Sequence, residues 1–328
     1  MEEKLGWGIV ATGGIAATIA EDLRLLPEAR LAAVSSRSMA RATEFAAAHG
    51  AAAAYDSYED LAADPGVDVV YVANPHPQHF GPVKAALEAG KAVLNEKAFT
   101  STLADAETLV AMARERDLFL MEAMWTRFNP LVSRLRELVG DGAIGTVRQV
   151  WASNGHPVAT DPENRFWNPA IGGGALLDMG VYPVSFAHMI LGEPSQVTAM
   201  GTIAESGVDA EVSLMLGWPD GQRAHLGASM ISPMPTTAAV IGTSGRVDVA
   251  AHFQAPTRMT LHRLGHEPED FGLAQEGRGY VWQLREVDAC VRAGRTESEI
   301  MPLHDTLAVM RTLQTTIDKL QIAVVPGS

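Results

Sequence analysis

Residues 5–16 read LGWGIVATGGIA, a short apolar run that leads through a glycine-containing turn into a helical pattern. A buried strand joined to a helix in this way is the arrangement that holds the pyrophosphate of a dinucleotide. Gly13 stands where the backbone must approach the phosphates closely, while Ala11 and Ala16 replace the first and third glycines of the usual pattern. The motif alone also fits a purely structural turn, so its context decides. The candidate cofactor-binding residues of this turn are Thr12, Gly13, Gly14 and Ile15.

The first 122 residues alternate short apolar runs with helical patterns. The runs lack polar alternation, which is typical of strands that are buried on both faces. The predicted strands are residues 5–10, 31–35, 67–73, 92–94 and 118–121. The predicted helices are residues 15–25, 39–49, 77–89 and 103–116. Strands that alternate with helices predict βαβ units and a doubly wound parallel sheet of the Rossmann type over residues 1–122.

The pattern changes after Glu122, where strand-like stretches follow one another across tight turns. In the turn at residues 219–221, which read PDG, proline presets the first position and glycine can adopt a positive φ. The predicted strands are residues 147–153, 196–203, 211–218, 223–230, 238–241 and 246–249. The predicted helices are residues 130–139, 281–293 and 303–320. We expect residues 123–328 to form an α+β domain with a large, mostly antiparallel, open-faced sheet, whose C-terminal helix can pack back on the first domain.

Composition narrows the class of protein further. A chain of 328 residues with 47% hydrophobic and 20% charged residues is typical of a globular protein with two domains. The net charge of −14 repels phosphate backbones and anionic membranes, so we expect neither nucleic acid nor a membrane as a partner. No apolar run approaches the roughly 20 residues that cross a bilayer, and no signal-peptide pattern is seen. A single cysteine, Cys290, excludes an intrachain disulfide and favours the cytoplasm.

The end of the second predicted strand indicates which cofactor is used. NAD sites usually carry an acidic residue there, about 20 residues beyond the glycine turn, to hold the ribose 2′-hydroxyl. Here residues 35–38 read SSRS, and Arg41 follows one helical turn later. A 2′-phosphate could accept hydrogen bonds from Ser36 and form ion pairs with Arg37 and Arg41. The alternative is that both arginines are solvated charges at a helix start. We expect NADP(H) to be preferred, with NAD(H) as the alternative.

Polar side chains also follow the strand predicted at residues 67–73. Residues 74–79 read NPHPQH and should lie at the carboxyl edge of the sheet, where ligands bind. Asn74, His76 and His79 are therefore candidates for contact with the cofactor, and the alternative is an ordinary surface position. The spacing of the two histidines resembles a metal pair, but no cysteine or carboxylate cluster accompanies it. We predict no metal site.

Glu96 and Lys97 follow the strand predicted at residues 92–94, at the same edge of the sheet. A lysine in this position is a candidate for polarising a reacting oxygen, and the alternative is a surface charge at a strand end. Further along, residues 172–183 read GGGALLDMGVYP. Three glycines let the backbone approach a ligand and can begin a helix. Asp178 and Tyr182, four residues apart, should project from one face of that helix.

These side chains are suited to the oxidation of an alcohol. A base must take the hydroxyl proton while hydride leaves to a nicotinamide. Free tyrosine, with a pKa of about 10, is a poor base near neutrality, but a lysine cation stabilises the phenolate and lowers that pKa. We assign Tyr182 as the acid/base and Lys97 as its assistant, with Asp178 holding a substrate hydroxyl or tuning Lys97. The structural alternatives are an interface residue for Tyr182 and a helix cap for Asp178.

Four segments carry a resemblance to a known family. They are residues 76–79, the Glu96-Lys97 pair, the run MEAMWTRF at residues 121–128 and the segment of residues 172–182. In this order and spacing they resemble the glucose–fructose oxidoreductase / inositol dehydrogenase (Gfo/Idh/MocA) family. The likeness extends over essentially the whole chain and is greatest to the branch of dimeric dihydrodiol dehydrogenases and NADP-dependent D-xylose dehydrogenases. Ala98 stands where the family's Glu-Lys-Pro motif has proline.

The resemblance implies residue roles. Lys97 and Tyr182 match the family's catalytic pair, and Asp178 matches its acidic partner. Tyrosine, where many relatives have histidine, favours the sugar and dihydrodiol branch over inositol dehydrogenases. Together with the glycine turn and the 35–41 segment, the cofactor candidates are Asn74, His76, His79, Glu96, Lys97, Trp125, Arg127, Arg165 and Trp167. The substrate candidates are Trp125, Phe166, Asp178 and Tyr182, with Trp167 as a further aromatic wall and core packing as the alternative for Phe166.

The sequence as a whole predicts an NADP-dependent oxidoreductase that acts on an aldose, a related polyol or a trans-dihydrodiol. Relatives associate through the open face of the C-terminal sheet, so the resemblance also implies a homodimer or larger homo-oligomer. One alternative is a glycosidase that uses bound NAD for a transient oxidation. Another is a non-catalytic NADP(H) sensor, which would be expected to lose the Lys–Tyr pair that this chain retains.

Overall fold

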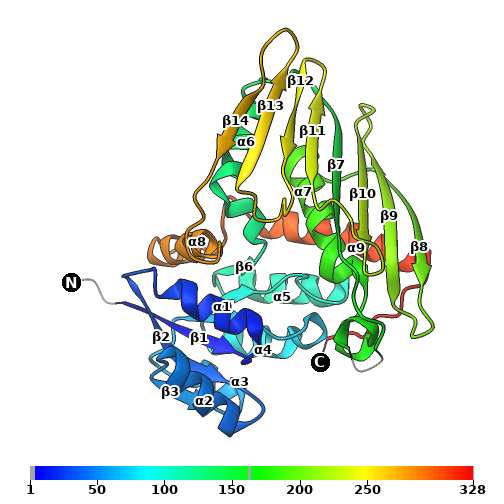
Figure 1. Cartoon of the computed structure of the whole chain (residues 1–328). Helices are drawn as coiled ribbons and strands as arrows, with labels where there is room; N and C mark the ends of the chain where they lie inside the picture. Colours follow the sequence, from blue (N-terminus) through cyan, green and yellow to red (C-terminus); the bar gives the residue numbers. More distant parts are fainter. Residues whose placement is uncertain (1–3, 162–163, 328) are drawn as a thin grey trace. The chain divides into compact units, whose positions relative to one another are not determined.

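The computed structural model describes residues 4–161 and 164–327 of the chain (Figure 1). Contacts divide the chain into two units. Unit 1 contains the chain up to Ala123, the segment Glu276–Thr306 and the residues from Pro326 onward. Unit 2 contains Met124–Gln275 and Leu307–Val325. The sequence placed one boundary after residue 122, whereas the contacts add a stretch of the C-terminal third of the chain to the first unit.

Unit 1 is built around a parallel sheet of six strands in the order β3-β2-β1-β4-β5-β6. Its strands are β1 (Leu5–Val10), β2 (Ala29–Ser35), β3 (Ala53–Tyr55), β4 (Val69–Val72), β5 (Ala92–Asn95) and β6 (Leu120–Glu122). The strands β4 and β5 are buried along their whole length, as a parallel sheet covered by helices on both faces requires. The predicted doubly wound sheet of the Rossmann type is confirmed. Its strand order reverses between β1 and β4, the place where such sheets bind ligands.

The helices of unit 1 form two groups (Figure 1). One contains α1 (Gly14–Leu23), α2 (Met39–His49) and α8 (Val281–Arg292), and the other contains α3 (Tyr58–Ala63), α4 (Phe80–Glu88) and α5 (Leu103–Glu115). Right-handed crossovers that run in opposite directions from the point of reversal place these groups on opposite faces of the sheet. Local signals begin and end the helices. Ser57 and Thr102 accept hydrogen bonds from backbone N–H groups in the first turns of α3 and α5, and Gly50 ends α2 with a φ of 81°.

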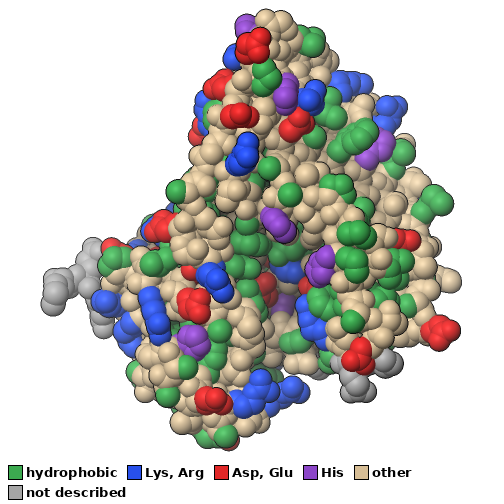
Figure 2. Space-filling view, in the orientation of Figure 1, with side chains coloured by type: hydrophobic (Ala, Val, Ile, Leu, Met, Phe, Trp, Pro, Cys, Tyr) green, Lys and Arg blue, Asp and Glu red, His purple; other side chains and the backbone are tan. Residues whose placement is uncertain are grey.

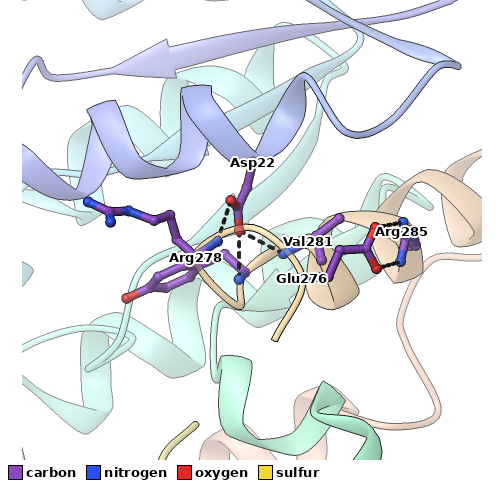
Figure 3. Close-up of polar contacts among 6 residues, drawn as sticks. Asp22, Glu276, Arg278, Val281 and Arg285 are labelled. Atoms are coloured by element: carbon purple, nitrogen blue, oxygen red, sulfur yellow. Dashed lines mark hydrogen bonds and ion pairs between the residues drawn. The ribbon is translucent and has the colours of Figure 1, made fainter. Parts of the chain in front are cut away.

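A side chain of α1 caps the distant helix α8 (Figure 3). Asp22 is 1% exposed, and its two carboxylate oxygens accept hydrogen bonds from the backbone N–H groups of Arg278, Tyr280 and Val281 at 2.7, 2.8 and 3.1 Å. Orphaned N–H groups at a helix N-terminus are normally satisfied by a nearby residue of the same chain segment. Here the cap comes from 256 to 259 residues away, and it anchors the returning segment on the first helix of the unit.

Unit 2 is built around an eight-stranded sheet in the order β14-β13-β12-β11-β7-β10-β9-β8. Its strands are β7 (Val147–Gly155), β8 (Gln196–Ile203), β9 (Asp209–Gly217), β10 (Arg223–Ser229), β11 (Ala238–Gly242), β12 (Gly245–Val249), β13 (Arg258–Arg263) and β14 (Glu269–Gly272). The pair β7–β10 is parallel and every other pairing is antiparallel. The predicted second sheet, large and mostly antiparallel, is therefore confirmed.

One face of this sheet is covered by helices and the other is open. α7 (Val181–Leu191) packs on β7 and β10, and α9 (Leu303–Leu320) lies against α7 through a bond between His188 Nε2 and Thr312 Oγ1 at 2.9 Å. α6 (Pro130–Gly140) contributes Arg134 over the ring of Phe271 on β14. On the open face, Met200, Trp151 and Met215 are 74%, 52% and 48% exposed. Figure 2 shows hydrophobic side chains scattered over this face of strands β7–β10.

The sequence missed several elements and misplaced others. β3 and α3 were overlooked because they are three and six residues long, and β3 is only half buried. β13 and β14 were overlooked because charged residues stand at their ends. The helix predicted at residues 77–89 is divided into a 3₁₀ turn, His76–Gln78, and α4. Residues Pro169–Leu191 are long and apolar enough to cross a membrane, but 72% of that window is buried inside the structure, as in the core helix of a globular protein.

Candidate active site

The β1–α1 turn of unit 1 leaves the start of a helix open. Gly13 forms the N-cap of α1 without any side-chain capping bond, and a Cβ atom at Gly13 or Gly14 would meet nothing within 4 Å. The first turn of α1 carries no acidic residue. Ala11, at the first position of the motif, has a φ of 82°, the conformation that glycine adopts most easily. Exposed N–H groups and the positive end of the helix dipole make this turn suited to a phosphate group.

A groove of about 410 Å³ extends from this turn across the ends of β1, β2 and β4. It is lined by the predicted residues Thr12, Gly13, Ser36, Arg37, Arg41 and Asn74. Both arginines are exposed, and no ion pair within the described residues engages them. Thr12 Oγ1 lies 3.5 Å from Ser36 Oγ, so the two hydroxyls approach each other at the head of the groove. An open phosphate cradle beside two arginines fits a dinucleotide that carries a 2′-phosphate.

The sequence missed the far wall of this groove. Asp56, Ser57, Tyr58 and Glu59 line it, directly after β3. Because β3 and α3 were not predicted, nothing in the pattern placed these residues beside the arginines. The negative charges of Asp56 and Glu59 on this wall partly offset the positive charges of Arg37 and Arg41 in the groove.

His76 and His79 do not line the groove. His76 is 5% exposed and belongs to the 3₁₀ turn that follows β4. His79 has no exposed surface, and its ring nitrogens lie 2.7 Å from the Asn74 carbonyl oxygen and 3.0 Å from that of Phe99. Burial lowers the pKa of His79 to about 4, so the ring is neutral near pH 7. His79 thus connects two loops from a fully buried position, and its predicted contact with the cofactor stays a prediction.

Glu96 supports the backbone beside Lys97. The Tyr71 hydroxyl donates to Glu96 Oε1 at 2.5 Å, and the Lys97 backbone N–H donates to Glu96 Oε2 at 3.2 Å. Glu96 is buried and Lys97 is half-buried at the carboxyl end of β5. The peptide between Lys97 and Ala98 is cis. Glu96 thus orients the segment that carries the lysine.

In unit 2, Tyr182 is held by Trp125. Trp125 begins a short 3₁₀ turn, Trp125–Phe128, and its Nε1 donates to the Tyr182 hydroxyl oxygen at 3.1 Å. Both side chains are half-buried. The sequence predicted a regular helix from Asp178 to Tyr182. The structure differs, because residues Leu176–Gly180 form a π-helical turn that passes directly into α7.

Asp178 is paired with Arg165, which stands in the 3₁₀ turn Arg165–Trp167. Arg165 Nη2 lies 2.7 Å from Asp178 Oδ2, and the side chains of these residues are 44% and 14% exposed. The guanidinium also stacks over the ring of Phe166, 4.1 Å from its centroid. The predicted contact of Arg165 with the cofactor stays a prediction, and within unit 2 the structure pairs Arg165 with the Asp178 carboxylate. The predicted neighbours Phe166 and Asp178 are brought together with it.

Two other residues predicted near the cofactor make hydrogen bonds within unit 2, and their contact with the cofactor stays a prediction. Trp167 is buried, and its Nε1 donates to the Ala159 carbonyl oxygen at 2.9 Å. Arg127 is 2% exposed, and its guanidinium donates to Ser185 Oγ at 3.3 Å and to the Ser185 carbonyl oxygen at 3.4 Å. These contacts stabilise the loop around residue 160 and the start of α7.

The glycines at residues 172–174 lie close to other residues of unit 2. A Cβ atom at Gly173 would lie 2.6 Å from the Phe166 carbonyl oxygen, and one at Gly174 would overlap Asp209 Oδ1. Gly174 has a φ of 122°. The interpretation that these glycines make room for a ligand is therefore replaced by one in which they make room for Asp209 and a backbone loop.

Asp209 and Asn154 are the residues of this site that the sequence did not indicate. Asp209 Oδ2 accepts a hydrogen bond from the Leu176 N–H at 2.6 Å, and Asn154 Nδ2 donates to the Met179 carbonyl oxygen at 3.1 Å. Burial raises the pKa of Asp209 to about 7 in spite of its backbone donors. A polar residue at the start or end of a predicted strand gives no sign of its partner. Within residues 4–161 and 164–327, no cluster of three His, Cys, Asp or Glu side chains is suited to a metal.

Comparisons with known proteins agree with this architecture. Residues 5–124 match the family model described as oxidoreductase family, NAD-binding Rossmann fold, and residues 132–248 match the GFO/IDH/MocA C-terminal domain. The trans-1,2-dihydrobenzene-1,2-diol dehydrogenases of Sus scrofa and Homo sapiens are 39% and 38% identical to this chain, and in each case the match covers 92% of both chains.

Solved structures of two oxidoreductases are similar over nearly the whole chain. A 3-ketoreductase from Actinomadura kijaniata, in complex with NADP and TDP-benzene, superposes with a TM-score of 0.84 at 27% identity and covers 96% of this chain and 98% of its own. The aldose-aldose oxidoreductase of Caulobacter crescentus, in complex with glycerol, gives a TM-score of 0.88 at 26% identity, with 97% and 98% covered. The predicted family is confirmed: this chain belongs to the GFO/IDH/MocA family of NAD(P)-dependent oxidoreductases.

Proposed function

We propose that this protein is an NADP(H)-dependent dehydrogenase that acts on a hydroxyl-bearing carbon of a sugar, a polyol or a trans-dihydrodiol, or on the matching carbonyl. The observation that carries the proposal is the Trp125–Tyr182 hydrogen bond one turn beyond the Asp178–Arg165 pair. The phenol of Tyr182, the carboxylate of Asp178 and the ring of Trp125 thus lie near the start of α7. These groups suit a small polyhydroxylated substrate, and the names of the relatives point to the same class.

Tyr182 is proposed to exchange the substrate's hydroxyl proton. In the oxidative direction the phenolate oxygen takes the proton from the substrate O–H, the C–H bond breaks and the carbon becomes a carbonyl. Bound NADP⁺ supplies the acceptor for the hydride that leaves this carbon. In the reductive direction the phenol returns the proton to the new alkoxide. Trp125 Nε1 can only donate, so it stabilises the phenolic oxygen most when the oxygen carries negative charge.

Lys97 and Asp178 are proposed to assist. The lysine cation favours the ionised phenol and can orient the reacting oxygen. Asp178 can accept a hydrogen bond from a neighbouring substrate hydroxyl once a ligand competes with Arg165 for it. Phe166 and Trp125 can pack against an apolar face of a sugar or diol ring. We propose unit 1 as the cofactor unit and unit 2 as the substrate unit.

The preference for NADP(H) over NAD(H) is proposed from the groove of unit 1. Ser36, Arg37 and Arg41 can bind a 2′-phosphate, and the end of β2 carries no carboxylate that would repel it. The negative charges of Asp56 and Glu59 on the far wall would repel a 2′-phosphate. The preference therefore depends on the net electrostatic effect of the two walls on that phosphate. A structure in complex with NADP is known for the ketoreductase relative.

A homodimer formed through the open face of the unit 2 sheet is proposed as the assembly. This face contains a hollow of about 900 Å³ lined by Trp151, Met200, Met215, Met234 and Met259 among others. An apolar surface of this kind is typical of an interface between subunits. We also propose the cytoplasm as the compartment, since the only cysteine is a buried thiol.

The proposed reaction is tested by turnover with a panel of aldoses, polyols and trans-dihydrodiols, each with NADP⁺ and with NAD⁺. The expected result is net NADPH formation, seen by its fluorescence, with at least one substrate of these classes. Hydrolysis of a glycoside with a tightly retained cofactor and no net NADPH would contradict the proposal and favour a glycosidase. Cofactor binding without turnover of any substrate in either direction would favour a sensor.

A further inference from the structure

The helix that carries Tyr182 begins with an irregular turn. Residues Leu176–Gly180 are π-helical, with backbone hydrogen bonds that reach back five residues, and α7 continues without a break. A π turn accommodates one more residue than an α turn, so it rotates the residues before it relative to the residues after it. Such turns are rare and are frequently found at functional sites. An arrangement of this kind needs contacts that favour it over a regular helix.

Asp209 supplies such a contact at the start of the turn. It is the first residue of β9 and is 1% exposed, and its Oδ2 accepts a hydrogen bond from the Leu176 N–H at 2.6 Å. The opposite carboxylate oxygen occupies the space that a Cβ atom at Gly174 would fill. Carboxylates are stabilised at a helix N-terminus by the free N–H groups and the dipole. A strand of the sheet therefore holds the first turn of this helix through one side chain.

A second strand holds the other end of the turn. Asn154, near the end of β7, is 6% exposed, and its Nδ2 donates to the Met179 carbonyl oxygen at 3.1 Å. In a regular helix this carbonyl would accept from the N–H of residue 183, which is a proline and has none, so Asn154 supplies a partner that the helix cannot. Gly180, the last residue of the turn, packs closely, since a Cβ atom there would lie 3.4 Å from Ala228 Cβ on β10. Side chains of β9 and β7 thus hold the two ends of the turn, and β10 packs beside it.

We propose that Asp209, acting with Asn154, fixes the π turn of residues Leu176–Gly180 and thereby places the Tyr182 hydroxyl for proton transfer. Asp209 is a positioning residue, because it contacts the backbone of the helix start and acts through Tyr182. This role of Asp209 also predicts how its removal would change kcat and cofactor binding. A shift of about 1 Å at a reacting group can cost about 100-fold in rate, whereas binding in the separate cofactor groove should be unaffected. This inference rests on the proposed role of Tyr182.

The test compares two ways of removing the contact with two matched controls. Asp209→Ala deletes the acceptor, and Gly174→Ala drives a methyl group into its place. Glu211→Gln changes a carboxylate two residues along the same strand, which bonds to Thr202 and Ser229 and not to the helix. Gly192→Ala changes another glycine with a positive φ, 74°, at the other end of α7, where a Cβ atom meets nothing within 4 Å.

Each variant is measured for kcat, KM, NADPH affinity by fluorescence titration, and hydrogen exchange of the amides of residues 175–182. Rates are expressed per NADPH-binding site, so that unfolded protein does not count. We expect Asp209→Ala and Gly174→Ala to lower kcat by about 10- to 100-fold and to accelerate exchange in this segment, with NADPH affinity within about twofold. Asp209→Asn keeps one acceptor oxygen and should recover most of the lost kcat. Both controls should resemble the wild type.

Normal kcat per site in folded Asp209→Ala or Gly174→Ala, or unchanged exchange at residues 175–182, would overturn the proposal. If Asp209→Ala does not fold, the comparison of Gly174→Ala with Gly192→Ala decides in its place. Equal losses in that pair would also overturn it, because backbone strain alone would then explain them. Tyr182→Phe is measured alongside. If it keeps normal kcat, the proposed function of Tyr182 fails, whereas loss in Tyr182→Phe without loss in the Asp209 variants rejects only the positioning role.

Discussion

The Tyr182 hydroxyl oxygen accepts a hydrogen bond from Trp125 Nε1 at 3.1 Å, and this contact shapes what the phenol can do. An indole N–H has no acceptor capacity, so the phenolic proton must be directed to a different partner. When that proton leaves, the same N–H faces a negative oxygen and its bond becomes stronger. The arrangement therefore favours a phenol that gives up and regains its proton over one that serves only as packing.

Replacement of Tyr182 by phenylalanine removes the hydroxyl that we propose transfers the proton, together with the acceptor of the Trp125 Nε1 hydrogen bond. We expect kcat to fall by about 10² to 10⁴, the usual contribution of general acid–base catalysis, with thermal unfolding and NADPH affinity nearly unchanged. Lys97→Met should lose a similar factor, and the double variant should be little worse than either single one, since residues that act as a unit are not additive. Normal turnover in Tyr182→Phe, with NADPH binding verified, would remove the phenol from the mechanism.

Arg37 gives a second prediction for a single side chain. Arg37→Asp replaces a proposed 2′-phosphate partner with a repelling charge, and we expect the ratio of kcat/KM for NADP⁺ to that for NAD⁺ to fall by about 10- to 100-fold, the value of one charge-assisted hydrogen bond. Arg116→Asp, which changes an exposed arginine at the end of α5, is the control and should leave the ratio unchanged. A wild-type preference for NAD⁺, or equal ratios in Arg37→Asp and the wild type, would be evidence against the arginine pair.

Whole elements show which features sequence patterns can predict. The bounds of β1, α2 and α9 agree with the prediction, because the apolar spacing that defines each element is local to it, and α2 is also followed by Gly50. The π turn before α7 was not predicted, although Pro183 has no N–H for the Met179 carbonyl and so interrupts the regular pattern. The two side chains that support the turn stand on β7 and β9, and no local pattern reveals them. The partners of His79 and Arg165 were not predictable for the same reason. Their residue types suggest a ligand, but their partners are supplied by segments that only the fold brings near.

The cap on α8 provides a prediction at this scale. Asp22→Ala leaves three backbone N–H groups without their acceptor in a buried position, and we expect the free energy of unfolding to fall by about 2–3 kcal/mol. The control is Glu21→Gln in the same helix, whose exposed carboxylate lies 3.5 Å from Arg278 Nε and should contribute under about 1 kcal/mol. Urea unfolding followed by circular dichroism measures both. Equal, small losses would show that the α8 cap is dispensable.

For the molecule as a whole, the two units should respond to acid in opposite ways. Burial lowers the pKa of His79 in unit 1 from 6.5 to about 4, so its contribution to stability is present above pH 6.5 and is lost as the pH falls toward 4. Burial raises the pKa of Asp209 in unit 2 from 3.8 to about 7, so its contribution is greatest below pH 4 and is lost as the pH rises toward 7. Each shift corresponds to a few kcal/mol at most, at about 1.4 kcal/mol per pKa unit.

Hydrogen exchange at pH 7.5 and pH 5.5 tests this opposition. On acidification, core amides of β4 and β5 should become less protected relative to those of β9, after correction for intrinsic exchange rates. Asp209→Asn should abolish the change in unit 2 and leave that in unit 1. Parallel changes of both sheets in the wild type, or an unaltered unit 2 response in Asp209→Asn, would contradict the assignment of these two groups.

The open face of the unit 2 sheet makes a prediction about assembly. Met200→Asp places a charge on a side chain that is 74% exposed, so the fold should tolerate it, while burial of that charge in an interface would be costly. We expect light scattering to give a dimer or larger species for the wild type at micromolar concentration and a smaller species for the variant. The control is Leu264→Asp, which changes a side chain that is 76% exposed between β13 and β14, away from the hollow. A wild-type monomer of 34.9 kDa would reject the proposed dimer.

The return of the segment Glu276–Thr306 to unit 1 has a consequence for biosynthesis. The residues up to Ala123 leave the ribosome long before two contacts with the returning segment can form. These contacts are the hydrogen bond from the Leu120 N–H to the Thr296 carbonyl oxygen and the cap that Asp22 provides for α8. Roughly 180 residues separate these events, which takes about 10–40 s at typical translation rates. During that interval the side of α1 that will contact α8 is uncovered. Unit 1 therefore completes its folding only after the segment Glu276–Thr306 has been synthesised, and until then the surface of α1 that faces α8 is open to other chains.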